Sequence, residues 1–170
     1  MQKLYSQIVG LPVFDEFSRS PIAFVRDVII DTENGKVVAF LVKQDRIIVP
    51  MDIESFTSGL FIANKDRILP IDDVLRVHEV VKRDIHVIGE KVITEREKTL
   101  LGRAVDYSID TTHMMLTGLY VAKIFFFFHF QERIIPFNKI VKINKGSIVV
   151  KDSQPLKEAE KAQAAEKVFA

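Results

Sequence analysis

Residues 27–42 read DVIIDTENGKVVAFLV, and this stretch decides the fold. Two runs rich in valine and isoleucine flank the dipeptide Asn34-Gly35. Asn-Gly between two β-branched runs is the strongest short-range signal for a β-hairpin. We therefore expect two antiparallel strands, Ala23 to Ile30 and Lys36 to Lys43, joined by a turn. Asp31 stands at the start of this turn, where a carboxylate can accept backbone N–H bonds.

The hairpin pattern returns 79 residues later in the chain. At this offset Gly10, Val13, Glu16, Asp27, Ile30, Asp31, Thr32 and Val42 coincide with Gly89, Val92, Glu95, Asp106, Ile109, Asp110, Thr111 and Val121. An eight-residue insertion in the second copy follows, after which Gln44 to Ile48 aligns with Gln131 to Ile135. A repeat on this scale predicts two copies of one structural unit.

Each copy consists of short apolar runs separated by turn residues, a spacing typical of small barrels or sandwiches. Pro50 and Pro70 follow such runs, so we expect each proline to end a strand ladder and a short helical turn to begin there. We predict an all-β protein of two tandem small β-barrels, residues 1–80 and 81–152. Residues 153–170 are rich in Ala, Glu and Lys and read as a helical or frayed tail.

The chain resembles the PRC-barrel family, which includes the cytoplasmic domain of the photosynthetic reaction centre H subunit and many stand-alone proteins. In the first copy the resemblance rests on Gly10-x-x-Val13, Val25-x-Asp27-x-x-x-Asp31, Asn34-Gly35-x-Val37, Phe40-x-Val42, Ile48-x-Pro50 and Ile53. In the second it rests on Gly89-x-x-Val92, Leu101-Gly102-Arg103, Val105-Asp106, Ile109-Asp110, Leu119-x-Val121, Ile135-Pro136, Ile140 and Gly146. The resemblance implies a docking or assembly module rather than a catalytic domain.

Composition and motifs narrow the possible functions further. The chain has 170 residues, 48% of them hydrophobic, no cysteine and a net charge of +1, so disorder and cysteine-ligated zinc are excluded. The four histidines fit no metal-ligand spacing, and no nucleophile or phosphate-binding motif is present. We expect no catalytic, cofactor or metal site. The first residues lack the features of a secretory signal, and we expect a cytoplasmic prokaryotic protein without a transmembrane segment.

The segment Leu116 to Phe130 reads as one strand and carries the most unusual sequence of the chain, KIFFFFHF at residues 123–130. As a strand it would present phenylalanine on both faces, and one face must then be covered by the other barrel, a second copy or a partner protein. The predicted protein interface consists of Phe125, Phe126, Phe127, Phe128 and Phe130, with Lys123 and Arg133 as rim charges. Asp31, Gly35 and Asp110 are predicted as structural turn residues.

Two other functions remain open. The second half is the more basic, so RNA binding or a role in ribosome maturation is the main alternative. It requires Lys139, Lys142, Lys145 and Lys151, with Lys91 or Arg103, to gather on one surface. A small-ligand carrier with a cavity in or between the barrels is the third hypothesis.

Overall fold

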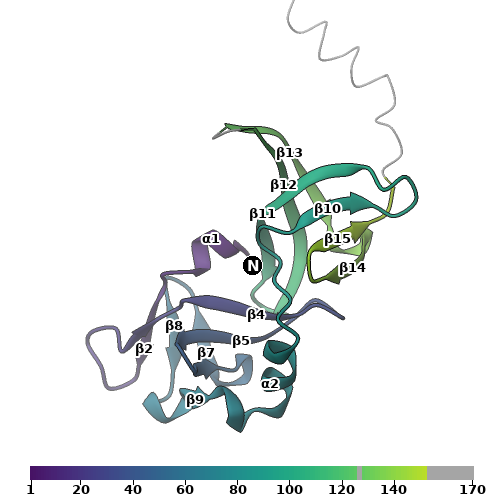
Figure 1. Ribbon diagram of the computed structural model, residues 1–170. Helices are drawn as coiled ribbons and strands as arrows, with labels where there is room; N and C mark the ends of the chain where they lie inside the picture. The colour runs from purple at the N-terminus through teal and green to yellow at the C-terminus, as the bar shows by residue number, and fades with distance from the viewer. Residues whose placement is uncertain (126–127, 153–170) are drawn as a thin grey trace, which may run out of the picture.

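The computed structural model describes residues 1–125 and 128–152, and these residues form a mostly β protein. Figure 1 shows the first half of the chain in the lower part of the molecule and the second half above it. The strands form one sheet of eleven strands and one of four. No helix in the described part of the chain is long and apolar enough to cross a bilayer.

The first half begins with a strand and a one-turn helix and ends with a longer helix. Its strands are β1 (Gln2–Leu4), β2 (Pro12–Asp15), β3 (Ala23–Phe24), β4 (Asp27–Asp31), β5 (Lys36–Lys43), β6 (Arg46–Ile48), β7 (Ile53–Phe56), β8 (Leu60–Ile62) and β9 (Leu69–Pro70). Its helices are α1 (Tyr5–Ile8), the 3-10 turns η1 (Pro50–Asp52), η2 (Lys65–Arg67) and η3 (Ile71–Asp73), and α2 (Leu75–Lys82). The predicted Asn34-Gly35 hairpin is present as β4 and β5, and helical turns begin at Pro50 and directly after Pro70, as expected. The first strand of the hairpin is shorter than predicted, because Ala23–Phe24 forms the separate strand β3, which pairs with β2 in the four-stranded sheet.

The second half contains fewer and longer strands. They are β10 (Lys91–Thr94), β11 (Leu100–Asp110), β12 (Met115–Phe125), β13 (Phe128–Pro136), β14 (Ile140–Asn144) and β15 (Ser147–Val150), with the 3-10 turn η4 (Phe137–Lys139) between β13 and β14. Its order of elements follows that of the first half. β10 lies 79 residues after β2, and each pairs in parallel with a later strand of its own half: β2 with β8, and β10 with β15.

Two expectations about the strands are wrong. The described sheets are not closed into barrels, because the ladders end where Pro50 and Pro136 lead into 3-10 turns and no ladder joins β6 to β7 or β13 to β14. The segment Leu116 to Phe130 is not a single strand. The chain reverses within it, so that Phe125 pairs with Phe128 across an antiparallel hairpin.

The two halves are joined by their equivalent hairpins. Met115 at the start of β12 pairs with Lys36 at the start of β5. The Val37 N–H donates to the Met114 carbonyl and the Leu116 N–H to the Gly35 carbonyl, each at 2.8 Å. β1 adds a second link by pairing with β11, so the large sheet runs through both halves.

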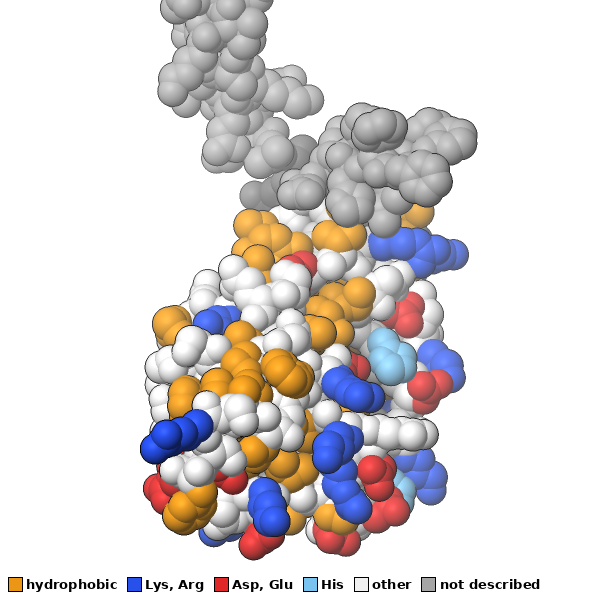
Figure 2. All heavy atoms as spheres, turned by 90° about the vertical axis from the view of Figure 1, so that its left-hand side faces the viewer, with side chains coloured by type: hydrophobic (Ala, Val, Ile, Leu, Met, Phe, Trp, Pro, Cys, Tyr) orange, Lys and Arg blue, Asp and Glu red, His pale blue; other side chains and the backbone are white. Residues whose placement is uncertain are grey.

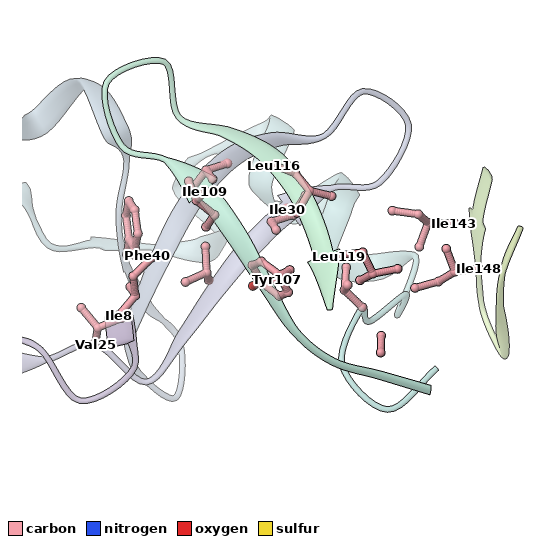
Figure 3. Packing of buried hydrophobic residues seen from close by; sticks show 14 of the residues in the cluster. Ile8, Val25, Ile30, Phe40, Tyr107, Ile109, Leu116, Leu119, Ile143 and Ile148 are labelled. Carbon is pink, nitrogen blue, oxygen red and sulfur yellow. The ribbon is translucent and has the colours of Figure 1, made fainter. Parts of the chain in front are cut away.

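One hydrophobic core also runs through both halves. Figure 3 follows it from Ile8 and Phe40, through Ile30 and Tyr107, to Ile148 near the other end. Phe40, Leu119 and Ile148 are completely buried. A smaller cluster of Ala39, Ile47 and Val77 holds α2 against the large sheet.

Candidate functional sites

The β12–β13 hairpin is the feature that most distinguishes the second half from the first. Figure 1 shows it reaching past the rest of its sheet. Its counterpart, β5–β6, turns after Lys43 with only Gln44 and Asp45 between the strands. The added length matches the eight-residue insertion in the sequence. The insertion therefore extends a hairpin rather than adding a separate element.

The predicted interface residues lie on this hairpin. Lys123 and Arg133 are exposed, in β12 and β13 respectively. The backbones of Phe125, Phe128 and Phe130 belong to the two strands, with Lys123 opposite Phe130. The side chains of these three phenylalanines lie outside the described residues, as do Phe126 and Phe127 entirely.

The outer edge of β13 has no strand beside it in the part of the chain that the structure describes. Its only ladder there is with β12. Ile134 projects from this strand with 64% of its surface exposed. An edge strand presents unpaired N–H and C=O groups on its free side, and β13, nine residues long, is a template for pairing with another chain.

Asp31 is buried, with 1% of its surface exposed, and organises the turn of the β4–β5 hairpin. Its carboxylate accepts the Glu33 N–H at 3.2 Å and the Asn34 side-chain N–H at 2.7 Å. Arg76, in α2, and Arg83, just after it, bring their guanidinium groups to the same carboxylate. The buried Asp31 carboxylate thus links the β4–β5 hairpin to α2.

Gly35 allows a close contact between the two halves. Its φ of +75° lies in the left-handed region that favours glycine. A Cβ atom at this position would lie only 2.5 Å from Cζ of Phe137, the first residue of η4. The phenylalanine ring therefore packs directly on the turn of the first-half hairpin.

Asp110 is the second-half equivalent of Asp31, but it has different partners. Its carboxylate accepts the Thr112 N–H at 2.9 Å and lies 3.3 Å from the amino terminus of Met1. The His113 ring also hydrogen-bonds to it. The hydrogen bond from His113, followed by that from Thr112 and the contact with the amino terminus, holds the pKa of Asp110 well below its usual range.

A cleft of about 340 Å³ lies where the two halves meet. Tyr5 of α1 and Tyr107 of β11 contribute rings whose centroids are 4.9 Å apart. Burial, followed by the nearby charge of Asp27 and a hydrogen bond to it, raises the pKa of Tyr5 to about 12. Burial is also the main cause that raises the pKa of Tyr107.

A cavity between the two units was the third hypothesis from the sequence, but its residues were not identified, because they are far apart in the chain. The one available signal was the recurrence of Asp27 as Asp106 at the repeat offset.

Several basic residues of the second half have a described neighbour. Lys91 lies opposite Arg103 in the β10–β11 ladder, and the Lys151 N–H donates to the Lys139 carbonyl. The Lys145 ammonium group is paired with Asp84 at 2.5 Å. On the face seen in Figure 2, charges of both signs alternate with hydrophobic side chains. RNA binding through these lysines stays a prediction.

Three of the four histidines contact different acidic residues, and the side chain of His129 lies outside the described residues. His78 is near Asp72, His86 contacts Asp84, and His113 contacts Asp110. Among residues 1–125 and 128–152, no three His, Asp or Glu side chains are placed to hold a metal ion.

The β hairpins and the short 3-10 turns after prolines define a small β-rich module. The PRC-barrel domain family model matches residues 1–88, and the chain therefore belongs to the PRC-barrel family. The match covers the first half and the connector that follows α2. A search of curated proteins found no match.

Proposed function

We propose that the protein is a non-enzymatic cytoplasmic adaptor built from two PRC-barrel units, residues 1–80 and 81–152. The family match supports the first unit. The same order of elements, the two parallel pairings β2–β8 and β10–β15, and the matching hairpins support the second. A fold hosts many activities, so the argument for function rests on one surface, the β12–β13 hairpin.

The free edge of β13 carries the proposal. Natural proteins blunt long edge strands with charges, prolines or a covering element, because an open edge promotes aggregation. Here nine residues have a ladder on one side only among the described residues, and the sequence at the end of the hairpin is IFFFFHF. Such an edge is suited to a partner whose extended segment adds a strand by β-augmentation.

The proposed partner is a different protein, which pairs with β13 and covers the phenylalanines. Phe125, Phe126, Phe127, Phe128 and Phe130 would supply the apolar anchors, and Lys123 and Arg133 the charged rim. The contact that holds the two halves together leaves this edge unused, because it involves the opposite end of β12 at Met115.

The chain itself supplies the design of a test. Deleting residues 123–130 joins Ala122 to Gln131 and leaves Gln131-Glu132 as the turn, matching Gln44-Asp45 of the first half. This variant removes the insertion and retains a turn that the chain already uses. Circular dichroism and urea unfolding establish that it is folded.

The experiment isolates the tagged protein from its native cell and measures by mass photometry whether it forms a complex of fixed stoichiometry. We expect one heteromeric complex with wild type and none with the deletion variant. The control is Phe17→Asp, which changes a phenylalanine that is 80% exposed far from the hairpin and should leave the complex intact. Loss of the complex in both variants, or its survival in the deletion variant, would contradict the proposal. A homodimer that disappears in the deletion variant would assign the edge to a second copy instead.

A further inference from the structure

The cleft between the halves has features that the adaptor function leaves unused. Its walls come from β4, β5, the end of α2, the connector of residues 84–88, and two tyrosines. Most of the wall is apolar, with Val28, Leu41, Val80 and Ile85 among its residues. The volume of about 340 Å³ lies at the lower end of the range for small-molecule sites.

The polar end of the cleft is negatively charged. Asp27 lines it, and Asp106, its equivalent at the repeat offset, directly precedes Tyr107 in β11 and is hydrogen-bonded to Ser6, the neighbour of Tyr5. The hydrogen-bond donors to both carboxylates are neutral groups. Asp27 accepts the Val28 N–H at 2.8 Å, and Asp106 accepts the backbone N–H and hydroxyl of Ser6.

Neither carboxylate has a cationic partner among the side chains that the structure describes. The ion pairs of those residues involve Asp31, Asp84, Asp110 and other acidic side chains, but neither Asp27 nor Asp106. Asp27 faces the cleft beside the half-buried ring of Tyr5 and the buried ring of Tyr107. A half-enclosed site screens charge less than water does, so the Asp27 carboxylate would attract a cation that enters the cleft.

We propose that this cleft binds a small organic cation, an ammonium group carried on an apolar chain. The ammonium group lies at Asp27 and the hydroxyl of Tyr5, where it gains a charge-assisted hydrogen bond and the negative face of an aromatic ring. The apolar chain lies along Val28, Val80 and Ile85. Anions are excluded by Asp27 and Asp106, and neutral molecules gain only the apolar contact.

Three probes of equal chain length test this chemistry: n-hexylammonium chloride, sodium hexanoate and hexan-1-ol. Binding is measured by isothermal titration calorimetry at pH 7 and constant ionic strength, and its position by chemical-shift changes of backbone amides. We expect saturable binding of hexylammonium with shifts at residues 27–30 and 84–88, weaker binding of hexanol, and none of hexanoate. Equal binding of hexylammonium and hexanoate, or no saturable binding of hexylammonium, would overturn the proposal.

Two variants locate the charge that is responsible. Asp27→Asn keeps the side-chain shape and should weaken hexylammonium binding at least tenfold, since a charge-assisted hydrogen bond is worth more than a neutral one. The matched control is Asp66→Asn, an exposed carboxylate in η2 that does not line this cleft, and its affinity should equal that of wild type.

If Asp27→Asn does not fold, Tyr5→Phe removes the hydroxyl from the same end of the cleft and should weaken binding of the ammonium but not of hexanol. Unchanged affinity in a folded Asp27→Asn variant refutes the assignment. None of these measurements involves the β12–β13 hairpin, so their outcome is independent of the docking experiment.

Discussion

Replacing Gly35 by alanine tests whether the hairpin turn of the first half is held tightly by the second half. The new methyl group would meet the Phe137 ring, with 2.5 Å to Cζ and 2.7 Å to Cε2. Both distances are far below normal carbon contacts. The ring is part of a packed core region, so either the ring or the backbone must move.

The magnitude follows from two separate costs. An alanine held in the left-handed region costs about 1–2 kcal/mol relative to glycine. Overpacking at a well-packed contact costs about 1–3 kcal/mol more. Gly35→Ala should therefore lower the free energy of unfolding by about 2–5 kcal/mol.

Gly146 provides the matched control, because its φ is +93° and a Cβ atom there would have no heavy atom within 4 Å. Gly146→Ala should show the backbone cost alone, about 1–2 kcal/mol. The measurement is urea unfolding followed by circular dichroism, with equal m-values as the condition for comparing the variants. In addition, Gly35→Ala should cost less in a Phe137→Leu background, where the smaller side chain leaves room. Equal losses in the two alanine variants, with no relief from Phe137→Leu, would refute the packing argument.

Three further predictions concern charged and titrating groups. Asp31→Asn should lower the free energy of unfolding by about 1.5–3 kcal/mol, because the buried side chain loses its charged hydrogen bonds to Arg76 and to the residues of the turn. Urea unfolding measures this loss, and an unchanged free energy would show these bonds to be unimportant. Asp110 has a lowered pKa in the folded state, so its contribution is complete above the unfolded value of about 3.9 and is lost as pH falls further. Urea midpoints measured from pH 5 to 2 should therefore fall less steeply for Asp110→Asn than for wild type, and parallel curves would contradict this. Tyr5 has a raised pKa of about 12, so its stabilisation is complete below about pH 10 and is lost between pH 10 and 12. Ultraviolet titration of Tyr5→Phe should lack the tyrosinate that forms near pH 12, and an unchanged titration curve would contradict the assignment.

Local signals predicted the local structure well. The Asn34-Gly35 dipeptide fixed the β4–β5 turn, and Pro50 and Pro70 marked the 3-10 turns, because each depends on backbone preferences of a few adjacent residues. The same kind of reasoning failed over Leu116 to Phe130. A run of phenylalanines has high strand propensity throughout and contains no glycine, proline or asparagine to mark where the chain reverses.

Long-range features were beyond the reach of these signals. Whether the sheets close depends on which distant edges pair, and β1 pairs with β11 across more than a hundred residues of chain. The cleft brings Tyr5, Asp27, Val80 and Tyr107 together from four separate elements. The partners of Asp31 were also invisible in the sequence, since Arg76 and Arg83 become its neighbours only when α2 packs on the sheet. α2 itself has a short amphipathic pattern that went unnoticed beside the stronger β signals.

The contact between the two hairpins has the form of an isologous interface. The contact joins positions that are equivalent at the repeat offset: Gly35 with Met114, Lys36 with Met115, and Val37 with Leu116. Each hydrogen bond across the contact therefore has a counterpart in which the two halves exchange roles. Homodimers with two-fold symmetry are assembled by this kind of reciprocal pairing. Here both partners belong to one polypeptide, so their effective concentration is set by the connector and does not fall on dilution. The association of two units, which a dimer must repeat each time two chains meet, is thus replaced here by folding of one covalent chain.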